Sequence, residues 1–378
     1  MLEEASFRAS ELVIERTQKP GVLPPLEELR FGTTFSDHMF SIEHLRGQGW
    51  STPRIHPLEF LRLHPAAQVL HYGMCCFEGM KAYAGSDGRI RMFRPMENMR
   101  RLSRSSSRLA LAAPPPEEML RCIQELLRVD DAWVPRRDGF SIYIRPFVYS
   151  SSDALGVSRP DKTAVNVVLS PVGPYFPSGM RPVSLFVDEV NRRAWPGGVG
   201  DAKVGGNYAP TIAPQVEALR KYGTAQVAYT FNMPGRDAEE AQLEEVGAMN
   251  LMILIQPREP GARPQLCTPP LGGTILPGIT RDSVLALARG WKEDVEVQER
   301  AITLRELSEA CAEKRLLEVF GCGTACVIQP VQEMVRASGE KYVPLTDASK
   351  PGSLSGKLYK TLLDIQYGRL ESEWSVPI

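Results

Sequence analysis

The pattern of apolar and polar positions predicts strands and helices in alternation along the whole chain. In the first half, apolar runs and helical periodicities fall in chain order at residues 71–83, 89–93, 97–111, 117–129, 141–148 and 164–169. Within residues 141–148, a period of two puts Tyr143 and Arg145 on one face of a strand and Ile142 and Ile144 on the other. The first half is therefore expected to mix strands with helices.

The second half continues with strand–helix units, from a strand at 183–187 to a closing helix at 357–367. Thr280 is expected to cap a helix over 281–289. Thr303 begins a capping-box pattern at the start of the next helix.

A stretch rich in proline and glycine at residues 170–181 predicts a linker. The sequence therefore predicts an α/β protein with two domains. We expect a small N-terminal α/β domain over 1–172, an interdomain linker over 173–183 and a large C-terminal domain over 184–378.

Composition excludes several classes of protein. The chain has 378 residues, and its net charge is −1, from 44 basic and 45 acidic residues. This balance gives no reason to expect a nucleic-acid or membrane surface. Apolar stretches such as 249–255 are too short to span a bilayer. The N-terminus is acidic and shows no targeting segment, so we expect the cytoplasm or the mitochondrial matrix.

Cysteine and histidine usage narrows the chemistry. The seven cysteines include no Cys-x-x-Cys pair, so we expect neither a disulfide framework nor a metal site. All five histidines lie within the first 71 residues. If the chain is an enzyme, we therefore do not expect histidine to carry protons in its reaction. Lysine is the next candidate, and lysine indicates Schiff-base chemistry.

One lysine has an unusual setting. Residues 195–208 surround Lys203 with five glycines. Such density serves tight turns and close approach of the backbone to a ligand, although a flexible surface loop is the alternative. The apolar neighbours Val199, Ala202 and Val204 weigh against a solvated loop.

Two further turns could bind an anion. Residues 276–281 lead into a helix after a glycine, which leaves backbone N–H groups for a phosphate; an ordinary capped helix is the alternative. Residues 321–325 form a glycine-rich turn after a buried strand, either an anion nest or merely a turn. Glu244 and Glu245 supply carboxylates, unless they belong to a solvated acidic turn. Together these features suit a phosphorylated cofactor attached to a lysine.

Five motifs carry a resemblance to a known family: Phe77–Ala82, Gly205–Tyr208, Glu245–Asn250, Leu276–Arg281 and Gly323–Ala325. In order and spacing they resemble the branched-chain aminotransferases, whose fold is the two-domain α/β fold of type IV pyridoxal-phosphate enzymes. Residues 17–20 and 35–39 look like the animal-type branch. The resemblance implies transfer of the amino group of leucine, isoleucine or valine to 2-oxoglutarate, which gives the 2-oxo acid and glutamate.

The resemblance also implies roles for residues around pyridoxal 5'-phosphate. Lys203 would form the internal aldimine and move the substrate proton, and Glu245 would hold the pyridine nitrogen protonated. Tyr208 would hydrogen-bond the cofactor's O3′. The phosphate would be bound by Arg101, the N–H groups of Ile279 and Thr280, and Thr324.

For the substrate, the resemblance implies a pocket with large apolar or phenolic walls. These walls map onto Tyr72, Phe77, Tyr143, Tyr175, Ala248 and Ala325. Thr324 and Ala325 would bind the α-carboxylate through their N–H groups, and Arg145 would bind the second carboxylate of glutamate or 2-oxoglutarate. Leu155 and Val157 match a loop that reaches into the partner subunit's pocket, which implies a homodimer.

Two positions depart from the animal-type pattern. Ala248 stands where these relatives usually have threonine, so the side-chain preference is expected to shift. Gln329 replaces the second cysteine of a redox pair that begins at Cys326, so Cys322 and Cys326 are expected to stay thiols.

Three alternatives remain open. A D-amino-acid aminotransferase or an aminodeoxychorismate lyase would share Lys203 and Glu245 but not the wall of Tyr72, Phe77 and Tyr143 with Arg145. The third is a catalytically silent cofactor-binding or scaffold protein.

Overall fold

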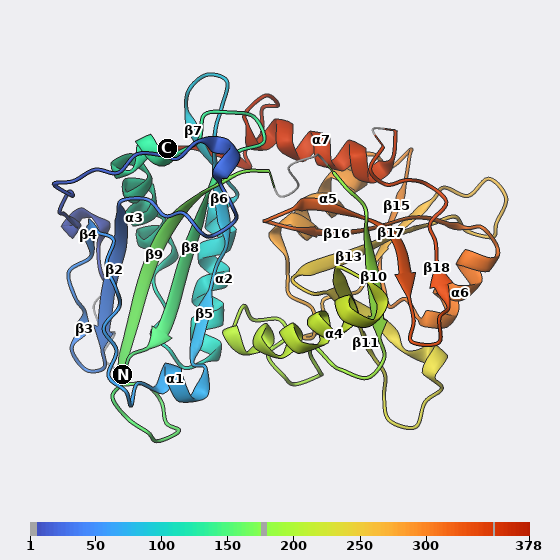
Figure 1. Cartoon of the computed structure of the whole chain (residues 1–378), viewed down its shortest axis with the longest axis horizontal. Helices are drawn as coiled ribbons and strands as arrows, with labels where there is room; N and C mark the ends of the chain where they lie inside the picture. Colours follow the sequence, from blue (N-terminus) through green and yellow to red (C-terminus); the bar gives the residue numbers. More distant parts are fainter. Residues whose placement is uncertain (1–5, 175–179, 351) are drawn as a thin grey trace. The chain divides into compact units, whose positions relative to one another are not determined.

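The computed structural model describes residues 6–174, 180–350 and 352–378. The chain forms two compact units, each built on one sheet with helices packed against it (Figure 1). Unit 1 comprises residues up to 177 together with 202–206 and 364–378, and unit 2 comprises 178–201 and 207–363.

Unit 1 is a ten-stranded sheet among the described residues. Its strands run in the order β1 (Val13–Ile14), β4 (Arg54–Pro57), β2 (His38–Leu45), β9 (Lys162–Val172), β8 (Ser141–Ser150), β6 (Met80–Ala84), β7 (Ile90–Phe93) and β19 (Ser375–Pro377), with β3 (Gly49–Trp50) beside β2 and β5 (Cys75–Phe77) beside β8. The helices of unit 1 are α1 (Gln68–Tyr72), α2 (Pro95–Arg108) and α3 (Pro116–Val129).

The two longer helices of unit 1 pack against each other and against the sheet. The buried apolar side chains include Met99 and Leu102 on α2, and Met119, Ile123 and Leu126 on α3. Their spacing of three and four residues is that of one helix face, so the hydrophobic effect fixes which side of each helix meets the core.

Among the described residues, unit 2 holds a nine-stranded sheet. Its strands are β12 (Gln242–Val246), β11 (Gln226–Phe231), β10 (Val183–Asp188), β17 (Val327–Val335), β16 (Leu316–Gly323), β13 (Met249–Ile255), β14 (Gln265–Thr268) and β15 (Glu296–Glu299), with β18 (Lys341–Tyr342) beside β17. Because β12 also pairs with β13, the strands from β12 through β11, β10, β17 and β16 to β13 close into a ring. The closed ring leaves these strands no unpaired edge.

Unit 2 also carries helices, and short 3-10 turns occur along the whole chain. The helices are α4 (Ile212–Tyr222), α5 (Ile279–Gly290), α6 (Leu304–Ala312) and α7 (Leu354–Gln366), of which α7 continues beyond Leu363 into unit 1. The 3-10 turns are η1 (Ala9–Glu11), η2 (Leu26–Glu28), η3 (Asp131–Trp133), η4 (Gly205–Asn207), η5 (Ala209–Thr211) and η6 (Ala238–Glu240).

Most of the predicted elements are confirmed, with small shifts at their ends. The strand expected at 141–148 is β8, and Arg145 Nη2 donates to Tyr143 Oη at 2.9 Å, which confirms that the two side chains share a face. Thr303 caps α6 as expected, since its hydroxyl accepts the N–H of Glu306 at 3.1 Å.

Two local expectations were wrong. The helix expected from Arg281 begins at Ile279 and is capped by Gly278, so Thr280 lies within its first turn. The glycine-rich turn expected at 321–325 is shorter, because β16 continues to Gly323. The alternative of a solvated acidic turn for Glu244 and Glu245 is excluded, because both residues lie buried in β12, which pairs with strands on both sides.

Domain boundaries differ from the sequence expectation in two stretches. Residues 202–206 and 364–378 lie in the C-terminal half of the sequence but pack with unit 1. Long-range pairing is the reason, since Val204 bridges to Cys76 and β19 pairs with β7. Part of the expected linker, residues 175–179, lies outside the described residues, so the linker stays a prediction.

In the part of the chain that the structure describes, no helix is both long and apolar enough to cross a membrane.

A buried carboxylate holds the start of α7. Glu318, on β16, accepts the backbone N–H groups of Leu354 and Ser355 at 2.8 and 3.0 Å, and the Ser355 hydroxyl at 2.7 Å. These N–H groups belong to the first helical turn, where they lack intrahelical acceptors. The negative charge also meets the positive end of the helix dipole.

Replacing Glu318 by glutamine should destabilise unit 2. The amide has only one oxygen, so its NH2 group would face a backbone donor, at a cost of about 1–3 kcal/mol. Thermal melting and urea denaturation should both show the loss. Glu333→Gln is the control, because Glu333 bonds Lys341 and Ser184 near the surface. Equal melting temperatures for the two variants would contradict this account of the cap.

Candidate active site

Lys203 is held in unit 1 by its own backbone. Its N–H donates to Ser105 Oγ at 2.9 Å, and its carbonyl accepts the N–H of Phe77 at 3.0 Å. The next residue, Val204, pairs with Cys76 as an isolated β-bridge. These bonds and the burial of Ala202 and Val204 exclude a flexible surface loop, as the apolar neighbours predicted.

The glycine after this bridge is required by space. A Cβ at Gly205 would lie 2.6 Å from Cys75 Sγ, closer than side-chain atoms approach. The Lys203 amine itself lies 5.0 Å from the centre of the Phe77 ring. The ring face attracts an ammonium ion and offers an apolar wall to whatever the amine carries.

Beside Lys203, a buried ion pair joins the segment between β5 and β6 to α2. Glu78 accepts Arg101 Nε at 2.6 Å and Arg101 Nη2 at 2.8 Å, and Asn98 Nδ2 donates to the same carboxylate at 2.8 Å. Burial alone raises the pKa of Glu78, but the charge and hydrogen bonds of Arg101 and the charge of Lys203 outweigh it, so this pKa lies below its usual range. Glu78 is therefore an anion that orients the Arg101 guanidinium.

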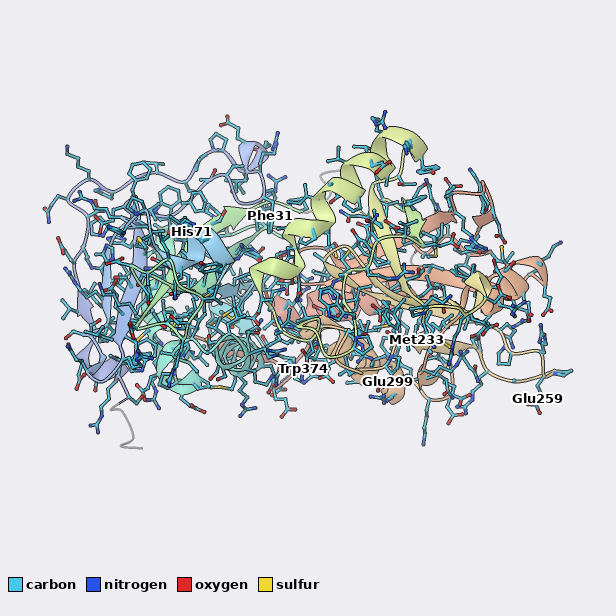
Figure 2. The ribbon with its side chains drawn as sticks, turned by 90° about the horizontal axis from the view of Figure 1, so that it is seen from below. Phe31, His71, Met233, Glu259, Glu299 and Trp374 are labelled. Carbon is cyan, nitrogen blue, oxygen red and sulfur yellow. The ribbon has the colours of Figure 1, made fainter. Side chains whose placement is uncertain are left out.

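An aromatic cluster with one guanidinium lies in the same unit. The Arg145 guanidinium stacks 4.7 Å from the Phe77 ring centre and bonds the Tyr143 hydroxyl. Phe31, labelled in Figure 2, meets the Tyr143 ring edge to face at 4.8 Å. A Cβ at Gly79 would lie 2.0 Å from Tyr143 Oη, so glycine makes the room for that hydroxyl.

Three other predicted substrate residues lie near α1 or in the loop after β8. The Tyr72 hydroxyl donates to the carbonyl of Leu155 within the same chain. The side chains of Leu155 and Val157 are 65% and 82% exposed. Tyr175, also predicted to line the pocket, lies outside the described residues.

In unit 2 the predicted carboxylate Glu245 is buried among donors. Its Oε2 pairs with Arg193 Nη2 at 2.7 Å, and its Oε1 accepts Asn250 Nδ2 and the Leu276 N–H, both at 2.8 Å. Three donors and one full positive charge favour the ionised form of a carboxylate that burial would otherwise neutralise.

Asn250 connects this carboxylate to the start of α5. Its Nδ2 donates to both Glu245 and the carbonyl of Leu276, and a Cβ at Gly278 would lie 1.9 Å from its Oδ1. A side chain at Gly278 would therefore displace the Asn250 amide. The N–H groups of Ile279 and Thr280 lie in the first turn of α5, where the helix dipole favours an anion.

The hairpin at Ala248 and the turn at Thr324 lie side by side in unit 2. A Cβ at Gly323 would meet the Ala248 carbonyl at 3.6 Å, and Cys326 Sγ lies 3.4 Å from Met249 Sδ. Two segments predicted to touch substrate, Ala248 and 324–325, are thus brought together. Burial raises the pKa of the Cys322 thiol well above its ordinary range.

Several supporting residues had no predicted role: Phe31, Glu78, Asn98, Ser105, Arg193 and Asn250. Glu78 and Asn250 lie inside the motifs that carry the family resemblance. A charged or amide side chain between apolar positions could have indicated that each is buried and bonded. Phe31, Ser105 and Arg193 gave no such signal, because long-range packing decides their contacts.

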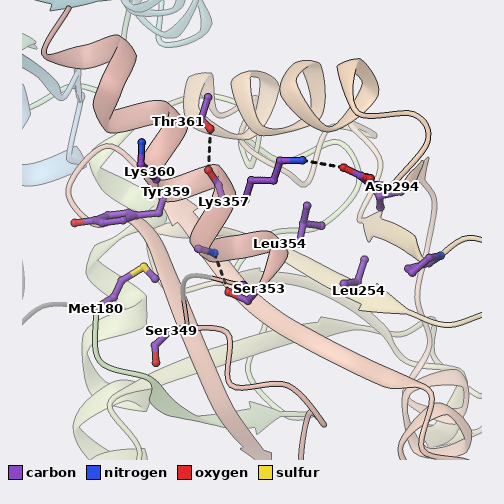
Figure 3. A pocket seen from close by; sticks show the side chains of 14 residues that line it. Met180, Leu254, Asp294, Ser349, Ser353, Leu354, Lys357, Tyr359, Lys360 and Thr361 are labelled. Atoms are coloured by element: carbon purple, nitrogen blue, oxygen red, sulfur yellow. Dashed lines mark hydrogen bonds and ion pairs between the residues drawn. The ribbon is translucent and has the colours of Figure 1, made fainter. Parts of the chain in front are cut away.

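A pocket of about 770 Å³ lies elsewhere in unit 2 (Figure 3). Its walls include Leu254, Val295, Leu354 and Tyr359, and the Lys357–Asp294 ion pair crosses its rim at 2.8 Å. No predicted site residue lines this pocket among the described residues. Over the same part of the chain, no cluster of three or more His, Cys, Asp or Glu side chains could hold a metal ion.

Comparison with known proteins gives a consistent result. Residues 75–334 match the family described as amino-transferase class IV. The chain is 44% identical to the mitochondrial branched-chain-amino-acid aminotransferase of Bos taurus over 99% of this chain and 93% of that protein. It is 43% identical to the cytosolic enzyme of Ovis aries over 99% of this chain and 94% of that protein.

The chain belongs to the branched-chain-amino-acid aminotransferase family, within the class IV aminotransferases.

Solved structures agree with this membership. The branched-chain aminotransferase of Thermoproteus uzoniensis with norvaline superposes with a TM-score of 0.69 at 26% identity, covering 90% of this chain and 99% of that one. The enzyme of Thermobaculum terrenum in its PLP form gives a TM-score of 0.67 at 21% identity, covering 91% and 99%, and this likeness bears on the fold alone. The resemblance and the fold class expected for this aminotransferase are confirmed.

Glu78→Gln should destabilise the aminotransferase in a pH-dependent way. At pH 7 the variant leaves Arg101 buried without its counter-charge, which should lower the free energy of unfolding by about 3 kcal/mol. Because the folded pKa of Glu78 is lowered, its contribution is present above the unfolded pKa, about 4.3, and is lost as pH falls through the folded pKa. The free energies of unfolding of the parent and of Glu78→Gln, measured by urea denaturation, should therefore become equal in acid.

Glu97→Gln is the matched control, because Glu97 pairs with Arg100 on the exposed side of the same helix α2. This variant should differ little from the parent at either pH. A Glu78→Gln difference that stays constant from neutral to acid pH would contradict the charge argument.

Proposed function

We propose that this protein reversibly transfers the amino group of leucine, isoleucine or valine to 2-oxoglutarate, with pyridoxal 5'-phosphate attached to Lys203. The observation that carries the proposal is the cluster in unit 1. There, the Lys203 amine and the Arg145 guanidinium both lie against the Phe77 ring, with Tyr143 and Phe31 beside them. Aromatic walls suit a branched aliphatic side chain, and a guanidinium suits the second carboxylate of glutamate.

The residues present also fit the cofactor. Lys203 offers an amine for an aldehyde, and Glu245 offers an anion for a protonated pyridine nitrogen. Glycines 205 and 278 make close approaches that any Cβ would block. When bound, pyridoxal 5'-phosphate supplies an electron sink for the carbanion formed at the substrate Cα.

We assign the remaining roles by the same chemistry. Arg101, the N–H groups of Ile279 and Thr280, and the Thr324 hydroxyl bind the phosphate, and Tyr208 bonds the cofactor's O3′. The N–H groups of Thr324 and Ala325 bind the α-carboxylate. The pocket walls are formed by Tyr72, Phe77, Tyr143, Tyr175, Ala248 and Ala325. Lys203 would take the proton from the substrate Cα and deliver it to C4′ of the cofactor, which is the proton movement that amino transfer requires.

We further propose that the protein works as a homodimer. Leu155 and Val157 project into solvent from a loop whose backbone Tyr72 fixes. Exposed apolar side chains on a fixed loop suit a second copy of the chain, whose pocket they would complete. Light scattering of the purified protein tests the dimer. Relatives are named as mitochondrial or cytosolic, and we propose one of these two compartments.

A turnover assay with leucine and 2-oxoglutarate tests the reaction. Glutamate and the branched 2-oxo acid should form, and D-amino acids should not replace leucine. Pyruvate formation without an amino acceptor would indicate a lyase, and cofactor binding without turnover would indicate a scaffold protein.

Two substitutions test the assigned chemistry. Lys203→Ala should abolish transamination, since it removes the amine that is assigned both to condense with the aldehyde and then to act as the base. Turnover by Lys203→Ala at a rate near that of the parent would contradict the assignment of Lys203 as the catalytic lysine.

Glu245→Gln should lower kcat far more than it weakens cofactor binding, because the charge matters most as the carbanion develops.

Gly79→Ala tests the carboxylate-binding role of Arg145. The new methyl group would displace Tyr143 Oη and with it the hydrogen-bonded guanidinium. KM for 2-oxoglutarate should rise by roughly 10- to 100-fold, and KM for leucine should rise less. Gly290→Ala is the control, because a Cβ there meets no atom within 4 Å. Equal increases in KM for leucine and for 2-oxoglutarate would contradict the carboxylate-binding role of Arg145.

A further inference from the structure

Arg193 makes the direct ion pair with Glu245, and both side chains are almost fully buried, at 2% and 3% exposure. Its second nitrogen, Nη1, donates to the carbonyl of Thr274 at 3.1 Å. One guanidinium thus bonds the carboxylate and the segment that leads to Leu276, whose N–H bonds the same carboxylate. The position of Glu245 is therefore fixed from two sides.

Two buried carboxylates follow each other on β12, and they differ in their partners. Burial raises the pKa of Glu244, although the Thr274 side chain and the charges of Arg193 and Arg192 partly offset it. Glu245 has the direct pair with Arg193 and two further donors. The charge of Glu245 also contributes to the raised pKa of the buried Cys322 thiol, of which burial is the main cause. Of the two glutamates, Glu245 alone has a direct ion pair with Arg193 among the described contacts.

We propose that Arg193 is a positioning residue that keeps Glu245 anionic and thereby keeps the proton on the pyridine nitrogen of the cofactor. This inference rests on the proposed role of Glu245. A carboxylate already paired with a guanidinium is a weaker base, so it competes less for the pyridinium proton than an unpaired buried carboxylate would. Without Arg193, the shared proton should move from the ring nitrogen to Glu245.

The test is the 15N chemical shift of pyridoxal 5'-phosphate labelled at its pyridine nitrogen and bound to the full-length protein. This shift reports protonation of the ring nitrogen independently of turnover. The parent protein should show a protonated nitrogen. Arg193→Met should move the shift toward that of a neutral pyridine and weaken cofactor binding by roughly tenfold or more. Arg193→Gln keeps an N–H donor without the charge, so it serves if the methionine variant does not fold.

Two variants serve as comparisons. Arg193→Lys restores the charge and should return the 15N shift close to that of the parent. Arg192→Met should leave the shift unchanged, because the Arg192 guanidinium donates to the carbonyls of Glu189 and Asn191 and its charge acts on Glu244.

The outcomes separate this inference from the proposed function. Suppose that the 15N chemical shift changes in Glu245→Gln but stays at the parent value in both Arg193→Met and Arg193→Gln. This result would overturn the role of Arg193 alone. In that case any loss of thermal stability in these variants would reflect a structural role. An unmoved shift in Glu245→Gln would overturn the assignment of Glu245 itself.

Discussion

A buried carboxylate stays charged only where donors and a counter-charge surround it, and this constraint organises both units. In unit 1, Glu78 requires Arg101 and Asn98, so the segment between β5 and β6 is joined to α2 beside the Lys203 segment. In unit 2, Glu245 requires Arg193 and Asn250, so β12 and the start of α5 are joined. Each network places a group suited to the cofactor on a rigid frame.

Rigidity at these positions serves the chemistry. Amino transfer needs a lysine, a pyridinium partner and a phosphate site held in fixed geometry, since positioning supplies much of the rate. Backbone pairing holds Lys203, and side-chain bonding holds Glu245. Glycines at 79, 205 and 278 allow Tyr143, Cys75 and Asn250 to approach closely, and a Cβ would displace these side chains. The glycine-rich motifs are thus explained by close packing more than by flexibility.

Local elements could be predicted because apolar periodicity reports which face of an element is buried. The strand at 249–255 and the helix at 117–129 follow it closely. Long-range pairing could not be predicted, and so the move of residues 202–206 into unit 1 went unforeseen. Glu244 and Glu245 stand in an acidic stretch that is typical of a solvated turn, and only the pairing of β12 with β11 and β13 buries them. Motifs led to the proposed site residues, whereas partners such as Arg193 emerge only from packing.

The most direct measurement of the central claim is covalent mapping of the cofactor. Protein purified with pyridoxal 5'-phosphate would be reduced with borohydride, digested and analysed by mass spectrometry. The account predicts a phosphopyridoxyl group on Lys203, and prior addition of leucine should remove it by converting the cofactor to its amine form. A phosphopyridoxyl group on a different lysine, or labelling of Lys203 that leucine does not affect, would contradict the account.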